Sequence, residues 1–232
     1  MRPLAPQVRD TLAIAAERLR DAILPPVCLA CERAVARHGA VCGTCWNGLR
    51  FLETPLVQVG FAFEDLRACV AYDDTARRLV SALKFADRTD LAPHMARWMA
   101  RTLVDLPTAP QPVVVPVPLH IRRMWSRRYN QAAELARTLA LETGLPFEPD
   151  TLTRIRATRQ QVGLGAEERE DNVRGAFRID PARGIAIEGR VVVLVDDVFT
   201  TGATLDACAR ALMRGGAERV HGLTFARVDE PT

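Results

Sequence analysis

The sequence predicts an α/β protein in which helices flank a parallel sheet and a small N-terminal segment is built around four cysteines. The sheet is predicted because apolar runs typical of buried strands alternate with helical patterns from residue 113 onward. Such alternation produces parallel sheets with helices on both faces. The small segment is predicted because four of the six cysteines form two closely spaced C-x2-C pairs.

The composition is that of a folded, water-exposed chain. Of the 232 residues, 48% are hydrophobic and 25% are charged, which excludes a disordered, collagen-like or low-complexity protein. The longest apolar runs, about ten residues, are too short to span a bilayer. Because the N-terminus lacks the pattern of an export signal, we expect no export. The formal net charge of +3 does not by itself predict nucleic-acid binding.

The patterns divide the chain into three segments. Apolar residues at helical spacing over 8–23 predict an N-terminal helix within residues 1–26, which ends at Pro25 and Pro26. The cysteine segment occupies residues 27–54, and the main domain occupies residues 55–232. The elements predicted in the main domain are, in order, strand 66–73, helices 75–86 and 90–106, strand 113–117, helix 129–143, strands 152–156 and 190–196, helix 203–214 and strand 219–226.

The paired cysteines are Cys28, Cys31, Cys42 and Cys45. A C-x2-C turn places two sulfurs on one side of a tight knuckle, and two knuckles supply the four thiolates of a tetrahedral zinc site. Because all four ligands are cysteines, such a site is closed and structural rather than catalytic. Two disulfides are the alternative, but they fit a secreted protein. A thioredoxin-like redox site needs a single pair that opens a helix after a strand.

The cysteine segment also combines basic and aromatic residues with a single acid, Glu32. This pattern is typical of surfaces that stack single-stranded bases. We favour the simpler interpretation, a metal-stapled lid on the main domain, and keep the DNA contact as the alternative. The residues concerned are Arg33, Arg37, His38, Trp46, Arg50 and Phe51.

A pair of acids and a small-residue turn follow the most apolar predicted strand. Asp196 and Asp197 come directly after VVVLV. Two adjacent carboxylates at the end of a buried strand are costly unless they bind something, and they can accept hydrogen bonds from the vicinal hydroxyls of a ribose. The turn that follows supplies backbone N–H groups and hydroxyls at a helix N-terminus, where a phosphate binds well. The order predicts a ribose 5-phosphate site, although each part alone also fits an N-cap or a turn. The turn consists of Thr200, Thr201, Gly202, Ala203 and Thr204.

Basic residues follow the predicted strand at 113–117, with no acid between residues 113 and 133. Arginine forks suit the oxygens of a pyrophosphate, and they also suit a DNA backbone. We favour pyrophosphate because the loop follows a buried strand of the same sheet. The polar residues 157–172 predict either a lid over the site or an exposed connector. Lys84, the only lysine, fits either a phosphate contact or a surface position. The basic residues are Arg122, Arg123, Arg127 and Arg128.

Taken together, these pieces resemble the ComF family, which joins a double C-x2-C zinc segment to a type I phosphoribosyltransferase domain. The signature of that domain is a strand followed by the string DD-x-x-TTG-x-T, which here occupies residues 196–204. The resemblance covers about residues 25–228 and also includes the PVPLH, RRYNQAAELA, QQVGL and NVRGAF stretches. Two positions depart from the family pattern, because Arg128 stands where members usually carry Gly and Val162 where they usually carry Thr.

The resemblance implies that the protein binds phosphoribosyl pyrophosphate (PRPP) with Mg²⁺ in the cytoplasm. In naturally transformable bacteria it also implies a role in handling incoming single-stranded DNA with the DNA-uptake machinery. The alternative is an active enzyme that transfers ribose 5-phosphate from PRPP to a base or an amine. A glutamine-hydrolysing half is not expected, because it needs a mature N-terminal Cys and Met1 is followed by Arg2. The PRPP-binding residues implied are Asp196, Asp197, Thr200, Thr201, Gly202, Ala203, Thr204, Arg122, Arg127 and Arg128.

Overall fold

The structure is a computed structural model that describes residues 24–228, except positions 54, 57–59, 86–87, 107–108, 120–128, 157–174 and 182. The chain divides into two units between Asn47 and Gly48. The helix expected over residues 8–23 lies outside the described residues. None of the described helices combines the length and hydrophobicity needed to cross a membrane.

The N-terminal unit consists of two turns, each of which carries one cysteine pair. Val27 and Ala34 form an antiparallel bridge around the first turn. The second pair opens the one-turn helix α2 (Gly43–Asn47). Within residues 24–47, Leu29 is the only buried apolar side chain other than cysteine. An apolar core this small cannot offset the entropy of ordering the chain, so the four cysteines must hold the unit together.

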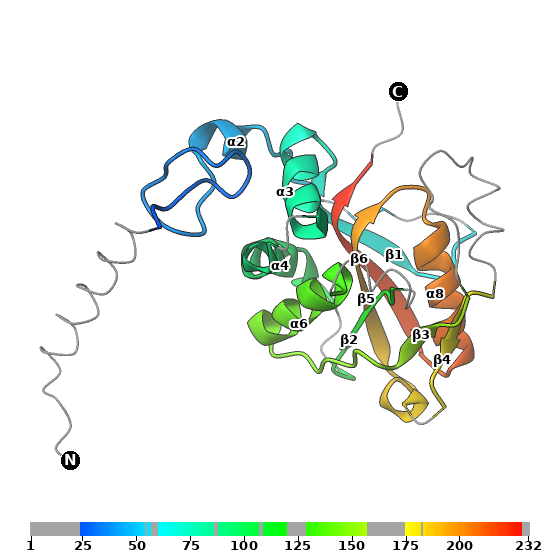
Figure 1. Ribbon diagram of the computed structural model, residues 1–232. Coiled ribbons are helices and arrows are strands. Elements are labelled where there is room, and N and C mark those ends of the chain that lie inside the picture. Colours follow the sequence, from blue (N-terminus) through cyan, green and yellow to red (C-terminus); the bar gives the residue numbers. More distant parts are fainter. Residues whose placement is uncertain are drawn as a thin grey trace, which may run out of the picture. The chain divides into compact units, whose positions relative to one another are not determined.

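The main unit is built on a four-stranded sheet with the order β1-β6-β5-β2 (Figure 1). All neighbouring strands are parallel, which confirms the predicted fold class. β5 and β6 lie in the middle and consist largely of buried Val and Leu, as expected of strands that are covered on both faces. The strands are β1 (Asp65–Ala71), β2 (Val113–Pro116), β5 (Val191–Phe199) and β6 (Arg219–Arg227).

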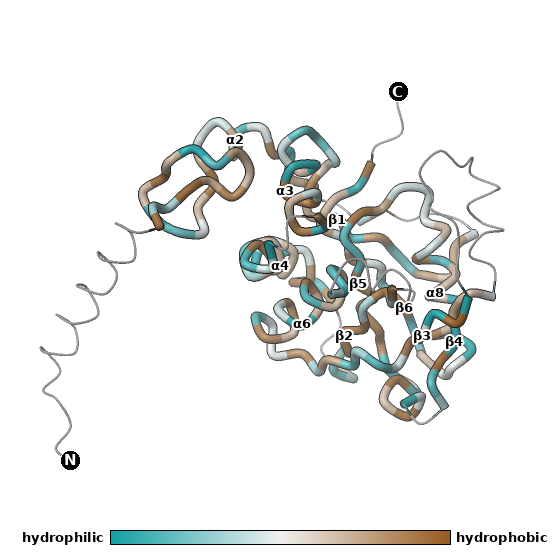
Figure 2. The backbone as a smooth tube through the Cα atoms, in the orientation of Figure 1, coloured by the Kyte–Doolittle hydropathy of each residue, from teal (hydrophilic) through white to brown (hydrophobic). Residues whose placement is uncertain are grey.

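Helices cover both faces of this sheet. α4 and α6 pack against each other on one face, and α8 covers the other (Figure 1). Hydrophobic positions run along the central strands in Figure 2. Val192 and Leu194 of β5 and Leu212 of α8 are fully buried. Each such side chain contributes about 2 kcal/mol of transfer free energy. The helices are α3 (Asp74–Phe85), α4 (Ala92–Ala100, flanked by 3-10 turns at Thr89–Leu91 and Arg101–Leu103), α6 (Gln131–Thr143) and α8 (Ala203–Arg214).

A second, two-stranded sheet lies beside α8. It pairs β3 (Leu152–Arg154) with β4 (Phe177–Ile179) in antiparallel register, and a 3-10 turn, Gly184–Ala186, follows. The sequence analysis did not identify β4, because three residues are too few to show a period. The pairing brings together the two ends of the segment 157–174, and the segment itself lies outside the described residues.

Residues 48–53 belong to the main unit, although the sequence analysis assigned them to the cysteine segment. Phe51 forms an antiparallel bridge with Val70 of β1, and its ring meets Trp98 edge-on at a centroid distance of 6.2 Å. Phe51 is therefore fastened to the sheet domain.

Candidate functional site

The acid pair lies within β5, just before the strand ends at Phe199. Side chains alternate along a strand, so Asp196 and Asp197 point to opposite faces of the sheet. Asp197 is buried and Asp196 is partly exposed. Asp196 Oδ1 accepts a hydrogen bond of 2.8 Å from the backbone N–H of Asp197. The backbone therefore orients one of the two carboxyl groups.

Lys84, from the last turn of α3, forms an ion pair with Asp197. The Nζ to Oδ1 distance is 2.8 Å, and the two side chains are 22% and 11% exposed. The sequence left Lys84 between a phosphate contact and a surface position, and the ion pair shows that its ammonium group lies against the acid pair. In the sequence, Lys84 stands out only as the single lysine, because no local pattern links it to Asp197, which lies 113 positions away.

The neighbouring charges act on the pKa of Asp196 in opposite directions. The pKa of Asp196 is raised to about 7, first by burial and then by the negative charge of Asp197. The cations Lys84 and Arg154 oppose this rise. Arg154 lies at the end of β3, with its guanidinium 5.2 Å from the centre of the Phe177 ring. The site thus combines one paired carboxylate with one carboxyl group that titrates near neutral pH.

The small-residue turn leads directly into α8. Gly202 adopts the left-handed region with φ 81°, and α8 begins at Ala203. A Cβ at Gly202 would lie 2.8 Å from Phe61 Cε1 and 2.9 Å from Phe199 Cε2. Both the conformation and the lack of space require glycine here. The first N–H groups of α8 have no partner within the helix and point toward the turn, which makes the turn suited to an anion.

Residues 60–64 pack against the start of α8. The carboxylate of Asp206 accepts a 2.7 Å hydrogen bond from Ala62 N–H and forms a 2.8 Å ion pair with Arg210. Phe61 stacks on Phe63 at a centroid distance of 4.9 Å. These contacts hold residues 60–64 against the glycine turn, where Phe61 lies next to Gly202. The sequence analysis missed them, because residues 60–64 form no regular element.

The basic loop begins and ends beside the acid pair. Val117 donates a backbone hydrogen bond of 2.9 Å to Val195 O, so the carboxyl ends of β2 and β5 are adjacent. Asn130 donates from Nδ2 to Val117 O at 3.0 Å and caps α6 through Oδ1. Arg122, Arg127 and Arg128 themselves lie outside the described residues, as do residues 160–172 of the expected lid.

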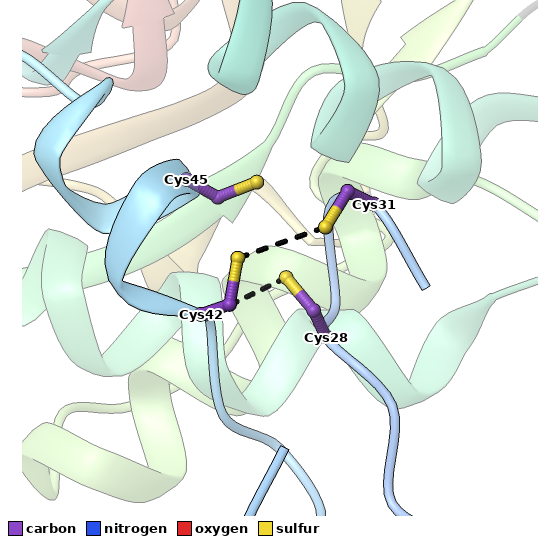
Figure 3. Close-up of side chains that lie close together, drawn as sticks. All are labelled: Cys28, Cys31, Cys42 and Cys45. Atoms are coloured by element: carbon purple, nitrogen blue, oxygen red, sulfur yellow. Dashed lines mark hydrogen bonds between the residues drawn. The ribbon is translucent and has the colours of Figure 1, made fainter. Parts of the chain in front are cut away.

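The four cysteines of the N-terminal unit converge in space (Figure 3). Their sulfur atoms all lie within 4.8 Å of one another, and the Cys31 and Cys42 sulfurs are 3.6 Å apart. Zn–S bonds of about 2.3 Å in a tetrahedron place sulfurs about 3.8 Å apart. The cluster therefore has the four donors, and nearly the size, of a tetrahedral zinc site.

The same cluster holds thiols whose pKa values diverge strongly. Burial raises the pKa of Cys28, but hydrogen bonds led by the Cys42 N–H outweigh it and lower the pKa to about 6. Burial and the neighbouring thiols raise the pKa of Cys45 to about 12. Four sulfurs so close together cannot all be thiolates unless a cation neutralises them, which agrees with a bound divalent metal.

Two family models match the chain. The model described as "Double zinc ribbon domain" matches residues 19–71, and that described as "Phosphoribosyl transferase domain" matches residues 130–232. The first contains all four clustered cysteines, and the second contains the acid pair and the turn. The metal centre is thus a structural zinc ribbon, as the sequence predicted.

Three characterised proteins are similar to the chain over most of its length. DNA utilization protein YhgH of Salmonella typhi is 34% identical over 203 residues, which cover 84% of this chain and 87% of that protein. Competence protein F of Haemophilus influenzae is 28% identical over 206 residues, covering 87% and 85%. Competence protein ComFC of Bacillus subtilis is 28% identical over 204 residues, covering 87% and 78%.

Proposed function

The chain belongs to the ComF family of competence proteins, and on this premise we propose that it binds PRPP with Mg²⁺ and takes part in handling single-stranded DNA during natural transformation. The observation that carries the first half is the end of β5. There, two carboxyl groups lie a few residues before a glycine turn that opens a helix of 12 residues.

The residues take distinct roles in this proposal. Asp196 and Asp197 accept hydrogen bonds from the ribose hydroxyls. The backbone N–H groups and hydroxyls of residues 200–204 hold the 5′-phosphate, since a helix N-terminus favours an anion. Arg122, Arg127 and Arg128 hold the pyrophosphate, and Mg²⁺ supplies further positive charge to it. The closeness of the β2 and β5 ends supports this arrangement, because the basic loop then starts beside the ribose.

Thermal unfolding of the full chain tests PRPP binding. A ligand that binds only the folded state raises the melting temperature, so Mg·PRPP should stabilise the wild-type protein. Asp197→Asn should remove most of the ligand-induced shift, whereas Arg37→Ala in the N-terminal unit should leave it unchanged. Equal shifts in all three proteins would contradict the ribose role of Asp197.

Phosphoribosyl transfer is the second candidate, and the match to a phosphoribosyl transferase domain favours it. A nitrogen of the acceptor would attack C1′ while the bond from C1′ to the pyrophosphate oxygen breaks, and pyrophosphate would leave with the bonding electrons. The test is release of pyrophosphate from Mg·PRPP in the presence of candidate bases and amines. Release that depends on the acceptor and disappears in Asp197→Asn supports transfer, and its absence with every acceptor supports a binding role.

For the DNA half of the proposal, we assign a contact to the N-terminal unit. Its described surface exposes Arg33, Arg37 and His38, and it also exposes Trp46 of α2, which is 41% exposed. Exposed arginines release counterions from a phosphate backbone, and an aromatic ring stacks on a base for about 1–3 kcal/mol. The proposed functional segments are residues 1–26, 27–54 and 55–232, of which residues 48–53 fold with the main unit. None of the six cysteines is in a disulfide, which fits a reducing compartment, the cytoplasm.

Salt-dependent binding to a single-stranded oligonucleotide tests the DNA contact. Trp46→Ala should weaken binding about tenfold or more, since a lost stack costs roughly 1–3 kcal/mol and about 1.4 kcal/mol is a factor of ten in affinity. It should leave the Mg·PRPP-induced thermal shift unchanged. The double substitution of Arg127 and Arg128 by Ala should do the reverse. Direct competition between PRPP and DNA, or no binding at low salt, would refute the separation of the two sites.

A further inference from the structure

The ion pair of Lys84 with Asp197 is a charged contact that reaches the acid pair from outside the β5 strand and its turn. Lys84 is held in place by more than this pair. The hydroxyl of Tyr129 donates a hydrogen bond to Leu83 O, and Tyr129 directly precedes Asn130, the N-cap of α6. The end of α3 is thereby fastened to the returning end of the basic loop, so the ammonium group is presented to β5 from a supported position.

Lys84 occupies one oxygen of the Asp197 carboxylate. Its Nζ lies 2.8 Å from Oδ1. Among the residues that the structure describes, no hydrogen bond reaches Oδ2 of Asp197 or Oδ2 of Asp196. Described residues thus hold one oxygen of each acid.

The charge state of Asp197 decides what it can recognise. An ionised carboxylate only accepts hydrogen bonds, whereas a neutral carboxyl group also donates one. Two adjacent carboxylates at a buried position cannot both stay ionised without a compensating cation. Lys84 supplies that cation to Asp197, and the positive charge of Arg154 acts on Asp196. Cys208 of α8 also faces this region, as a buried thiol with its pKa raised by burial.

We propose that Lys84 is a positioning residue, which holds Asp197 as an oriented, acceptor-only carboxylate and thereby makes the site select ribose phosphates over 2-deoxyribose phosphates. The proposal rests on the proposed binding of PRPP at the end of β5. It deepens that function, because it assigns the choice of sugar to a lysine that lies 113 positions away from the acid in the sequence. Lys84 remains on the carboxylate when the ligand binds and does not move to a phosphate.

The experiment compares three probes by calorimetry on the zinc-loaded full chain: Mg·PRPP, ribose 5-phosphate and 2-deoxyribose 5-phosphate. The wild type should bind ribose 5-phosphate about tenfold or more tightly than 2-deoxyribose 5-phosphate, because a hydrogen bond to a charged group contributes about 1.5–3 kcal/mol. Lys84→Met should weaken Mg·PRPP and ribose 5-phosphate by a similar factor of about ten. It should affect the deoxy compound little, so that the preference approaches one.

Two matched variants complete the design. Lys84→Arg should keep the preference for ribose, because it keeps the charge. Arg77→Met, on the same helix, removes the ion pair of Arg77 with Asp74, whose side chains are 62% and 79% exposed, and should change none of the three affinities. The double variant Lys84→Met with Asp197→Asn guards against a folding defect. It removes both charges and should melt at a higher temperature than Lys84→Met.

Each outcome decides the question. If Lys84→Met binds ribose 5-phosphate normally and loses only Mg·PRPP, then Lys84 is a phosphate ligand and the positioning role is wrong. An unchanged preference for ribose in Lys84→Met also overturns it, while binding of Mg·PRPP to the wild type would keep the proposed function intact. If the wild type binds none of the three probes, the PRPP proposal and the role of Lys84 both fail.

Discussion

Asp196 is a described side chain whose ionised form the fold disfavours. Its pKa is raised to about 7 because burial and the charge of Asp197 both disfavour the ionised form. A group of this kind is retained only where something other than stability requires it. At the residue scale, the cost of the acid pair is thus the physical evidence for a ligand that contacts it.

The substitution Asp196→Asn should therefore make the free energy of unfolding less dependent on pH. Between the ordinary carboxyl pKa of 3.8 and about 7, the folded state binds more protons than the unfolded state. Stability from this group consequently falls as pH rises through that window and is constant above it. At pH 8 the variant should be more stable by about 2 kcal/mol, a value reduced from the full shift because Asp196 is partly exposed.

Urea unfolding of the wild type and Asp196→Asn at pH 5 and pH 8 measures this difference. The exposed acid Asp150 serves as the control, because Asp150→Asn removes a carboxylate from the surface. If wild type and Asp196→Asn differ in stability by the same amount at both pH values, the fold does not raise the pKa of Asp196.

The start of α8 is the element on which the site depends most. Its first turn follows the end of β5 and the glycine turn directly. Asp206 in this turn accepts a hydrogen bond from Ala62 and so holds residues 60–64. These contacts join segments that are distant in the sequence. A change at the turn should therefore be felt both in stability and in binding of an anion at the helix N-terminus.

Gly202→Ala tests this element against Gly189→Ala. Both glycines have positive φ, 81° and 63°, so both substitutions cost about 1 kcal/mol in backbone strain. Gly189 has open space around its Cβ position, whereas Gly202 is crowded by Phe61 and Phe199. Gly202→Ala should thus cost a further 1–3 kcal/mol or so, from displaced rings, and should weaken Mg·PRPP binding.

Thermal melts with and without Mg·PRPP separate the two contributions. Gly189→Ala should lower the melting temperature modestly and keep the ligand-induced shift. If the two variants lose equal stability, the rings at Gly202 yield without cost and the turn is not a rigid cradle.

At the scale of the whole molecule, two units are stabilised by different physics. The main unit buries strands and helices around a continuous apolar core. The N-terminal unit relies on four sulfurs that lie within 4.8 Å of one another, since metal binding supplies folding energy where a core is missing. Loss of zinc should therefore act on one unit only.

Removal of zinc by a chelator, or the substitution Cys31→Ser, should loosen residues 24–47 and leave the sheet folded. Limited proteolysis at arginine should then cut first at Arg33 and Arg37, while the circular dichroism of the main unit and its melting temperature change little. Arg37→Ala, which retains all four thiols, is the control for the unit itself. Simultaneous unfolding of the sheet, or an absence of zinc in freshly purified protein, would contradict this division.

The sequence by itself determined the order of the elements, the parallel sheet and the zinc ribbon. Each of these depends on local information: strands such as VVVLV and helices such as α8 show their periods within a few residues, and the C-x2-C spacing defines a metal knuckle directly. The acid pair and the glycine turn were visible for the same reason, since they are contiguous. Their expected role in binding PRPP stays a prediction, as do the roles of the arginines at 122, 127 and 128.

Only the tertiary structure decided which distant residues act on the acid pair. Lys84 reaches Asp197 from α3, Phe61 closes the space above Gly202, and Phe51 joins the sheet domain rather than the zinc unit. No sequence pattern specifies such contacts, because they depend on how strand order and helix packing bring separate segments together. β4 was missed because its three residues are too few to show a period, and only the fold shows that it pairs with β3.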